Sequence, residues 1–448
     1  MSEGESTEAR DGGIRASVSL LRRNRDFRRV YVASLISLGG DWFLLVALFG
    51  LVLDLTGSAV AVALLLAAQD LTYFVVSPVG GLLADRLDRR LLMVAADIAR
   101  AVLCVGFLLL RTAGEVWVIY LLLGTMACFS AAFEPASLAA LPNLVEQEDL
   151  ATANALSGSL WGTMLAVGAA LGGAVTALFG RDAAIVIDAV SFATSAALIV
   201  RIRRSFSEAR EQTTSGGRLR EATVETLRYA RRDHRVLALL AVKFGWGIAG
   251  GVLVVIPLLA KGSFHAGDVG IGLLLAARGV GALIGPFVGR FALGPADRRI
   301  FTTIGAALAV FGVGYVLLGS VPRFALGHWT LLILAMLAVA IAHVGGGAQW
   351  MLSSYGLQKI VPDHIRGRIF AFDGMLVTLT FGLSSLLTGW LADSFGAPGT
   401  AMGMGAIALV WAAAWSWLTS DVRRATMLDG CGEAPPEAEV ELGPAAAT

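Results

Sequence analysis

The sequence predicts an all-α membrane protein with twelve transmembrane helices, arranged as two six-helix bundles related by pseudo-twofold symmetry. First, 56% of the residues are hydrophobic and 15% are charged, with a mean hydropathy of +0.73. A soluble domain carries about 25% charged residues. Second, apolar runs long enough to cross a bilayer recur along the whole chain. Third, one polar stretch divides these runs into six and six, and the two sets share a repeated segment.

The apolar runs define the expected helices in order. They occupy residues 29–53, 58–84, 91–111, 115–134, 153–180, 182–202, 236–260, 268–293, 300–320, 328–352, 366–392 and 397–419. Each is close to the roughly 20 residues that a helix needs to cross the hydrocarbon core. The 53 glycines suit close helix packing in lipid.

A polar, charged segment over residues 203–235 separates the sixth run from the seventh. We therefore expect an organisation of five parts. These are an N-terminal tail (1–28), a first bundle (29–202), a linker (203–235), a second bundle (236–420) and a C-terminal tail without fold (421–448).

An internal duplication supports the two-bundle interpretation. Residues 144–180 align without a gap on residues 360–396, at an offset of 216. Identical residues coincide at Gly158 with Gly374, at Gly173 with Gly389, and at Phe179-Gly180 with Phe395-Gly396. Both stretches are a polar loop leading into the fifth helix of a bundle, which is the pattern expected of repeated transporter halves.

The distribution of basic residues predicts the orientation in the membrane. With twelve spans, both termini and the linker share one side, which carries 28 of the 35 Lys and Arg residues. The other side carries four, and three lie inside spans. Because basic loops stay in the cytoplasm, we expect both termini to be cytoplasmic in a multi-pass protein of a bacterial plasma (inner) membrane.

Motifs for enzymes, metals and nucleotides are missing from the sequence. There is no GxxxxGK[ST], no HExxH and no GxSxG, and the three cysteines have no metal-binding spacing. We expect no enzymatic activity, no cofactor, no metal site and no nucleic-acid partner. A membrane-embedded enzyme or a signalling scaffold is the alternative class, but it would need a catalytic cluster or a soluble domain.

A charged motif lies between the second and third runs, in GGLLADRLDRR (80–90). Its spacing is Gly-x-x-x-Asp-Arg-x-x-Arg-Arg, formed by Gly81, Asp85, Arg86, Arg89 and Arg90. A remnant, GRFALGPADRR, recurs at 289–299 in the second half. With the six-plus-six pattern, this motif resembles the major facilitator superfamily over about 390 residues. Asp88 stands where the full family pattern has Gly.

Three further stretches resemble an exporter branch that includes macrolide-efflux and enterobactin-exporter-like proteins. They are LGGDWF (38–43), residues 133–156 and VPDHIRGRIFA (361–371). The resemblance implies a secondary active transporter, a monomer in the lipid bilayer, that exports amphiphilic drugs or secondary metabolites in exchange for protons and confers multidrug resistance. A siderophore exporter and a lysolipid flippase are alternatives within the same fold. Ala169 stands where proton antiporters often have Pro, which leaves antiport open.

The resemblance also implies a cytoplasmic gate. Asp85 would sit near the N-terminus of the eleventh helix, beside Arg366 and Arg368, where the helix dipole and the arginines favour a carboxylate. The contact would close the cytoplasmic side in the outward-facing state. The alternative is that the arginines of the motif only hold the loop in the cytoplasm.

Charged groups inside spans are functional candidates because they are costly there. A carboxyl group in a low dielectric has a raised pKa and can carry a proton near neutral pH. We expect proton coupling from Asp41 first, then Asp70, with His343 as a third candidate. The alternatives are a structural acid beside Gly39-Gly40, an ion pair with Arg278, and a hydrogen-bonded structural histidine.

Other polar residues of the spans are expected to border a central cavity. These are Ser37, Gln69, Tyr73, Trp246, Arg278 and Gln349. Asp97 and Arg100, three residues apart on one helix face, are expected to form a structural pair. Asp188, Lys243 and Asp373 are interpreted as structural charges near span ends, where snorkelling is cheap.

Overall fold

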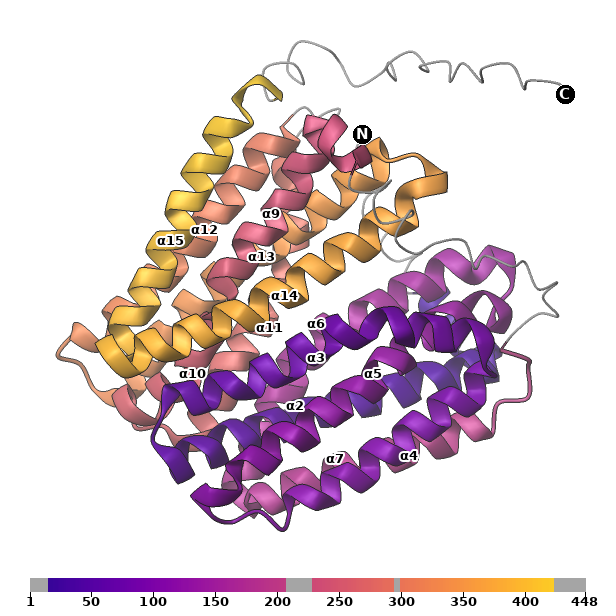
Figure 1. Ribbon diagram of the computed structural model, residues 1–448, viewed down its shortest axis with the longest axis horizontal. Coiled ribbons are helices and arrows are strands. Elements are labelled where there is room, and N and C mark those ends of the chain that lie inside the picture. The colour runs from indigo at the N-terminus through magenta and orange to yellow at the C-terminus, as the bar shows by residue number, and fades with distance from the viewer. Residues whose placement is uncertain (1–14, 207–227, 294–298, 423–448) are drawn as a thin grey trace, which may run out of the picture.

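The chain forms two bundles of helices that lie side by side, as the computed structural model in Figure 1 shows. The structure describes residues 15–206, 228–293 and 299–422, and in these ranges it contains helices and short connections but no strand. Residues 15–206 form the N-terminal half, and residues 228–422 form the C-terminal half. The predicted fold class is confirmed.

The N-terminal half begins with a short helix over 15–23 and continues with six long helices. These are α2 (Arg25–Thr56), α3 (Ala59–Arg86), α4 (Arg89–Phe107), α5 (Val116–Leu144), α6 (Leu150–Phe179) and α7 (Arg181–Val200). Side chains that accept hydrogen bonds from backbone N–H groups start three of them: Asn24 for α2, Ser58 for α3 and Asp88 for α4. Asp88 therefore has a local role as a cap at the position where it departs from the family motif.

The C-terminal half repeats this arrangement with an interrupted first helix. Its elements are α9 (His234–Gly250), a 3-10 turn (Gly251–Val254), α10 (Val255–Leu258), a π turn (Leu259–Ser263), α11 (Gly267–Ala292), α12 (Ile300–Ser320), α13 (His328–Ile360), α14 (Asp363–Phe395) and α15 (Ala397–Leu418). A Cβ on Gly251 would lie 2.3 Å from the carbonyl oxygen of Ser384. The 3-10 turn thus falls where α14 presses against the backbone.

Eleven helices of the described part are long and apolar enough to cross a membrane. The expected third span, 91–111, is not among them, because α4 is a helix of 19 residues that carries four charged side chains. They are Arg89, Arg90, Asp97 and Arg100. Since α4 packs against α5 and α7, it completes the first six-helix bundle, and its neighbours bury Arg89, Asp97 and Arg100, while Arg90 is half-buried.

Two pairs of helices join the halves: α3 with α14, and α6 with α11. The duplication maps α6 onto α14, so it exchanges these two pairs, as a pseudo-twofold axis requires. The approach is close, because a Cβ on Gly279 of α11 would lie 2.3 Å from the backbone nitrogen of Ala166 in α6. Glycine is needed where helix backbones touch in this way.

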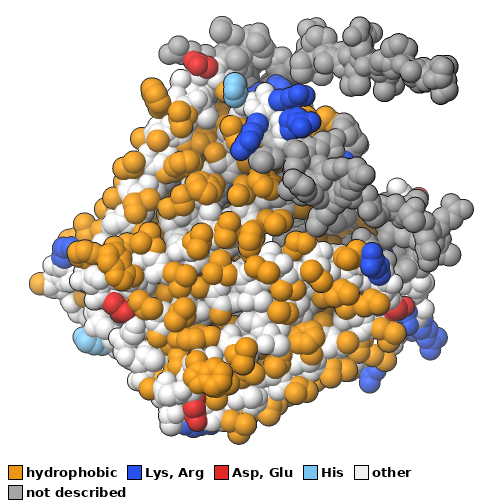
Figure 2. Space-filling model, in the orientation of Figure 1, with side chains coloured by type: hydrophobic (Ala, Val, Ile, Leu, Met, Phe, Trp, Pro, Cys, Tyr) orange, Lys and Arg blue, Asp and Glu red, His pale blue; other side chains and the backbone are white. Residues whose placement is uncertain are grey.

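Each half begins and ends on the same side of the molecule. Arg29 at the start of α2 donates to the carbonyl oxygen of Arg201 after α7 (2.6 Å), and Trp415 late in α15 donates to the carbonyl oxygen of Ala238 early in α9 (2.9 Å). We call this the near side and the opposite one the far side. Figure 2 shows apolar side chains spread over both halves, with charged side chains at the margins of the view.

Candidate functional site

Four charged side chains, two from each half, form an alternating ring at the far side. Asp54 lies near the end of α2, and Arg181 begins α7. Lys261 lies in the π turn after α10, and Asp268 lies in the first turn of α11. Arg181 contacts Asp54 at 2.5 Å and Asp268 at 3.1 Å. Lys261 contacts Asp54 at 2.7 Å and Asp268 at 3.0 Å. We call these four residues the far-side ring, and two of its four contacts, Arg181 with Asp268 and Lys261 with Asp54, link one half to the other.

A second contact joins the halves at the same level. Asp393, near the end of α14, accepts from the backbone N–H of Ala59 (2.6 Å) and from the hydroxyl of Ser58 (2.7 Å) at the start of α3. A carboxylate is favoured at this helix N-terminus by the free N–H groups and the dipole. Together with the far-side ring, this contact closes the far side.

The interface between the halves loosens toward the near side. Along α14, a Cβ on Gly389 would touch Ala63, and one on Gly382 would touch Leu71, but no described atom lies within 4 Å of a Cβ on Gly374. The contact between α14 and α3 is therefore close at the far side and looser toward the near side.

The second interface shows the same gradient. Along α6, a Cβ on Gly173 would lie 2.8 Å from Gly272, and one on Gly162 would lie 2.9 Å from Leu283. A Cβ on Gly158, nearer the near side, would meet no described atom within 4 Å.

The arginines of the 80–90 motif hold the N-terminal half together in this conformation. Arg89 is buried and donates to the carbonyl oxygens of Ala139 (2.8 Å) and Phe206 (3.1 Å), and Arg90 donates to that of Arg204 (2.6 Å). Gly81 is half-buried and Arg86 is exposed. The side chain of Asp85 lies outside the described part, so its expected contact with α14 stays a prediction. Arg366 donates to the carbonyl oxygen of Val361 (3.1 Å), and Arg368 is half-buried.

Four carboxylates gather around one guanidinium inside the N-terminal half. Arg100 of α4 forms a buried ion pair with Asp97, one turn before it, and stacks on Phe192 at 4.3 Å. Asp41 of α2 is half-buried and lies within electrostatic range of Arg100, Asp97 and Glu134. Glu134 of α5 is exposed and accepts a hydrogen bond from Tyr73 of α3. Hence the expected pair forms, and two predicted residues, Asp41 and Tyr73, join it in one polar region.

Asp188 of α7 is the fourth carboxylate, and it is not near a membrane surface. It is fully buried and accepts from Cys104 Sγ (3.3 Å) and from Ser191 Oγ (3.1 Å). The interpretation of Asp188 as a snorkelling charge was wrong, because α2 and α4 enclose its side chain. A signal was present in the sequence, since Asp188 and Ser191 share one face of α7.

A second polar group links the two halves at mid-depth. Arg278 of α11 is buried and donates from Nε to Nε2 of His343 in α13 (3.1 Å). A guanidinium only donates, so Nε2 must accept, and the imidazole proton must sit on Nδ1, which lies 3.1 Å from the carbonyl oxygen of Val339. Asp70 of α3 lies within electrostatic range of Arg278 without forming an ion pair with it. The exposed ring of Trp161 lies 5.5 Å from the guanidinium.

An aromatic group fills the middle of the C-terminal half. Trp246 of α9 packs against Trp350 (ring centroids 5.4 Å apart) and Phe381 (4.8 Å). Its indole N–H has no hydrogen-bond partner in the described part, and neither amide atom of the fully buried Gln349 has one. Hydrogen-bonding groups without a partner in the described part thus lie beside an aromatic surface, of which Trp350 is 41% exposed.

Lys243 and Asp373 form a buried ion pair between α9 and α14, and Lys243 also lies 4.4 Å from the ring of Trp350. Both side chains are 3% exposed, so they are enclosed rather than snorkelling. Of the remaining predicted cavity residues, Ser37 is buried against its neighbours and Gln69 is exposed. The far-side ring was not predicted at all; its members are single charges at span ends on the side that carries few basic residues.

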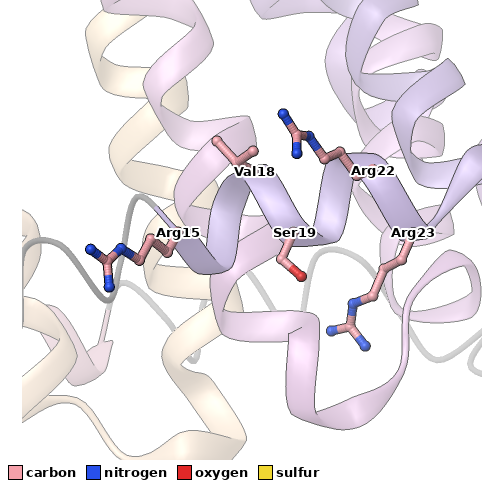
Figure 3. Close-up of a pocket in the computed structure, with 5 residues that line it drawn as sticks. All are labelled: Arg15, Val18, Ser19, Arg22 and Arg23. Carbon is pink, nitrogen blue, oxygen red and sulfur yellow. The ribbon is translucent and has the colours of Figure 1, made fainter.

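A shallow hollow lies elsewhere, along the short N-terminal helix. Figure 3 shows its lining residues, Arg15, Val18, Ser19, Arg22 and Arg23. All five of these described lining residues come from one helix. The region between the halves is therefore the better candidate for a cargo site.

Comparison with known proteins gives relatives along most of the chain. The profile of the transmembrane secretion effector family matches residues 17–441. An uncharacterized MFS-type transporter of Bacillus subtilis (strain 168), YfiS, is 31% identical over 186 residues, which are 41% of this chain and 44% of that protein. Macrolide efflux protein A of Streptococcus pyogenes is 25% identical over 264 residues, 58% of this chain and 64% of that protein. The match spans less than two thirds of the length of either relative.

Solved structures share the fold. A bacterial homologue of the human lysosomal transporter Spinster, in an inward-facing conformation, superposes with a TM-score of 0.69 at 15% identity, over 90% of this chain and 98% of that one. A bacterial homologue of the iron transporter ferroportin, also inward-facing, gives a TM-score of 0.66 at 16% identity, over 88% and 98%. At such identities the likeness concerns the fold alone.

Proposed function

The chain belongs to the transmembrane secretion effector family of the major facilitator superfamily, and on this premise we propose that it is a proton-coupled exporter of amphiphilic small molecules. It is a multi-pass membrane transporter and not an enzyme. The observation that carries the proposal is the polar region of the N-terminal half, where Asp41, Asp97, Glu134 and Asp188 surround the single guanidinium of Arg100. A cationic cargo or protons would balance this excess of carboxylates.

The orientation in the membrane follows from the distribution of basic residues. The near side carries most of the Lys and Arg residues and would face the cytoplasm of a bacterial cell. The far-side ring would then close the external side, and cargo would enter between the halves from the cytoplasm. Rocking of the halves about α3–α14 and α6–α11 would break the ring and expose the cargo outside.

Asp41 can exchange a proton for a cationic cargo. Protonated Asp41 gives up its proton when a cationic group approaches, and the resulting carboxylate pairs with the cation. When the cargo leaves outside, the carboxylate takes a proton from the external solution. One proton enters the cell for each positive charge released, and no group other than the carboxyl changes its covalent state.

The apolar part of the cargo would rest on exposed aromatic rings. Trp161 of the N-terminal half is 48% exposed, and Trp350 of the C-terminal half is 41% exposed. Large flat side chains with few rotamers bind varied apolar ligands at low entropic cost. The efflux function of the streptococcal relative supports export as the direction of transport.

The test is uptake into proteoliposomes with an acidic lumen, using cationic, zwitterionic and neutral amphiphiles in parallel. In molecules whose near side faces outward, the proposal predicts that cationic compounds accumulate only while the pH gradient lasts and that Asp41→Asn abolishes accumulation. Accumulation of cations in wild type without a pH gradient would overturn proton coupling. Selective transport of an anionic chelate would indicate a siderophore as the cargo, and selective transport of a lysolipid would indicate a lipid cargo.

A further inference from the structure

Asp188 is a fully enclosed carboxyl group of the N-terminal half. Its relative exposure is 0%, and its hydrogen-bond partners are a thiol and a hydroxyl, Cys104 and Ser191. No described Lys, Arg or His forms an ion pair with it. An ionised carboxylate buried without a cation is strongly unfavourable, whereas a neutral carboxyl group with two polar neighbours is not.

The neighbouring charges do not compensate for Asp188. From α2 it faces Asp41, and from α4 it faces Arg100 and the thiol of Cys104. Arg100 already forms its ion pair with Asp97. The middle of α6, the remaining helix packed against α7, contains no charged residue. Thus the only cation in range is committed, and the nearest uncompensated charge is another carboxyl group.

Gly40 brings Asp188 against the backbone of α2 directly beside Asp41. A Cβ on Gly40 would lie 2.3 Å from Oδ1 of Asp188 and 2.2 Å from Oγ of Ser191. Because Gly40 has no side chain, the Asp188 carboxyl group fits against the residue that directly precedes Asp41. Of these two acids, Asp41 is half-buried and Asp188 is fully buried.

Unused hydrogen-bonding capacity lies in the same polar region. Oδ2 of Asp97 and Oγ of Ser195 have no hydrogen-bond partner in the described part, and both residues are fully buried. Ser195 lies one turn beyond Ser191 on α7. Buried polar atoms in this situation are commonly bridged by water, which can also carry a proton.

We propose that Asp188 and Asp41 form a proton-sharing pair, in which Asp188 is the buried proton holder and Asp41 is the acid that meets the cargo. This rests on the proposed function and adds a second acid to it. Two adjacent carboxyl groups in a low dielectric do not both ionise without a compensating cation, so in the empty site the pair shares one proton. When a cationic cargo reaches Asp41, its positive charge takes the place of the shared proton, which goes to water. In the empty site the like charge of Asp188 thereby keeps a proton on the pair.

The experiment measures protons released per cargo bound by the purified protein, together with the pH midpoint of cargo binding. Wild type is compared with Asp188→Asn, Asp41→Asn and Asp182→Asn. Asp182 is the matched control, because it lies on the same helix but is exposed and paired with Arg111. Thermal unfolding of each variant reports whether the fold is intact.

Asp188→Asn is expected to bind cargo but to lower the pH midpoint by about one unit, because Asp41 loses the like charge beside it. Proton release at neutral pH then falls from about one to well below one per cargo, as the empty site is already ionised. Asp41→Asn should abolish release, and Asp182→Asn should match wild type. An unchanged midpoint and release in Asp188→Asn, or an equal change in Asp182→Asn, would overturn the pair. No release in wild type would overturn the proposed function instead.

Cys104→Ala provides an independent reading that keeps both acids, in case Asp188→Asn does not fold. Removing the thiol takes away a donor to the Asp188 carboxylate, so its ionised form becomes less stable. The pair should hold its protons more tightly, and the midpoint of cargo binding should rise. An unchanged or lowered midpoint in folded Cys104→Ala contradicts the proposal.

Discussion

Replacing Asp54 by Asn should open the far side of the transporter. Asp54 contacts both Arg181 of its own half and Lys261 of the other half, so one substitution removes two ion pairs of the ring. Asp268 would then remain as the single acid between two cations, and only its contact with Arg181 would still join the halves. The carboxamide has nearly the same shape as the carboxylate, so packing is retained while the charge is lost.

The size of the effect follows from exposure. The Asp54 side chain is 51% exposed, so solvent screens its pairs, and each is worth about 0.5–1 kcal/mol rather than the value of a buried pair. Of the two lost pairs only that with Lys261 joins the halves, so the closed far side is destabilised by about 0.5–1 kcal/mol, and the ratio of closed to open far side falls by a factor of about 2–5. High salt should weaken the wild-type ring in the same direction, since the Debye length falls to about 3 Å at 1 M.

The assay is a distance distribution between spin labels on the far side, one in each half. Gly114 and Gly327 are suitable positions for cysteines, because a Cβ at either would meet no described atom within 4 Å. Asp54→Asn should increase the population with the long distance at the expense of the short one. Asp182→Asn is the control. Its ion pair with Arg111 also lies at the far side, but both partners belong to the N-terminal half.

Two results would refute this reasoning. If Asp54→Asn leaves the distance distribution of wild type unchanged, the ring does not hold the halves together. If Asp182→Asn opens the far side as strongly, the effect comes from surface charge in general and not from contacts between the halves.

Three further predictions use other contacts of the molecule. Neutralising either partner of the buried Lys243–Asp373 pair should destabilise the protein by about 3–5 kcal/mol in thermal unfolding. The double variant Lys243→Met with Asp373→Leu should recover most of this stability. A double variant as unstable as the single ones would contradict the prediction. If the His343 ring acts only as an acceptor for the neighbouring guanidinium, His343→Gln should retain transport and His343→Leu should lose it, whereas inactivity of both would favour titration of the ring. Gly272→Val should separate the halves and abolish transport in a folded protein, while Gly403→Val, which meets open space, should be tolerated; activity of the Gly272 variant would exclude a need for close contact there.

The architecture could be predicted because it depends on patterns that repeat along the chain. Apolar length marks the spans, the polar stretch after residue 202 divides them, and the offset of 216 relates the halves. The third span was the least certain by composition, because α4 carries charges that are satisfied only by its neighbours in the bundle.

The candidate site was only partly accessible from the sequence. Periodicity along one helix was enough to pair Asp97 with Arg100. The position of Asp188 against Asp41 depends on how α7 packs on α2 at Gly40, and no pattern within either helix encodes that packing. The far-side ring likewise combines residues more than 120 positions apart, such as Asp54 and Arg181, whose proximity is a property of the assembled halves.

Cargo-driven proton movement tests proton-coupled export most directly. Proteoliposomes are loaded with a lipophilic aromatic cation, diluted into cargo-free buffer without a pH gradient, and followed with a pH-sensitive dye in the lumen. Exchange predicts that cargo efflux acidifies the lumen in wild type, while Asp41→Asn vesicles keep a constant pH. Protein-dependent efflux of the cation from wild-type vesicles at constant luminal pH would contradict proton coupling.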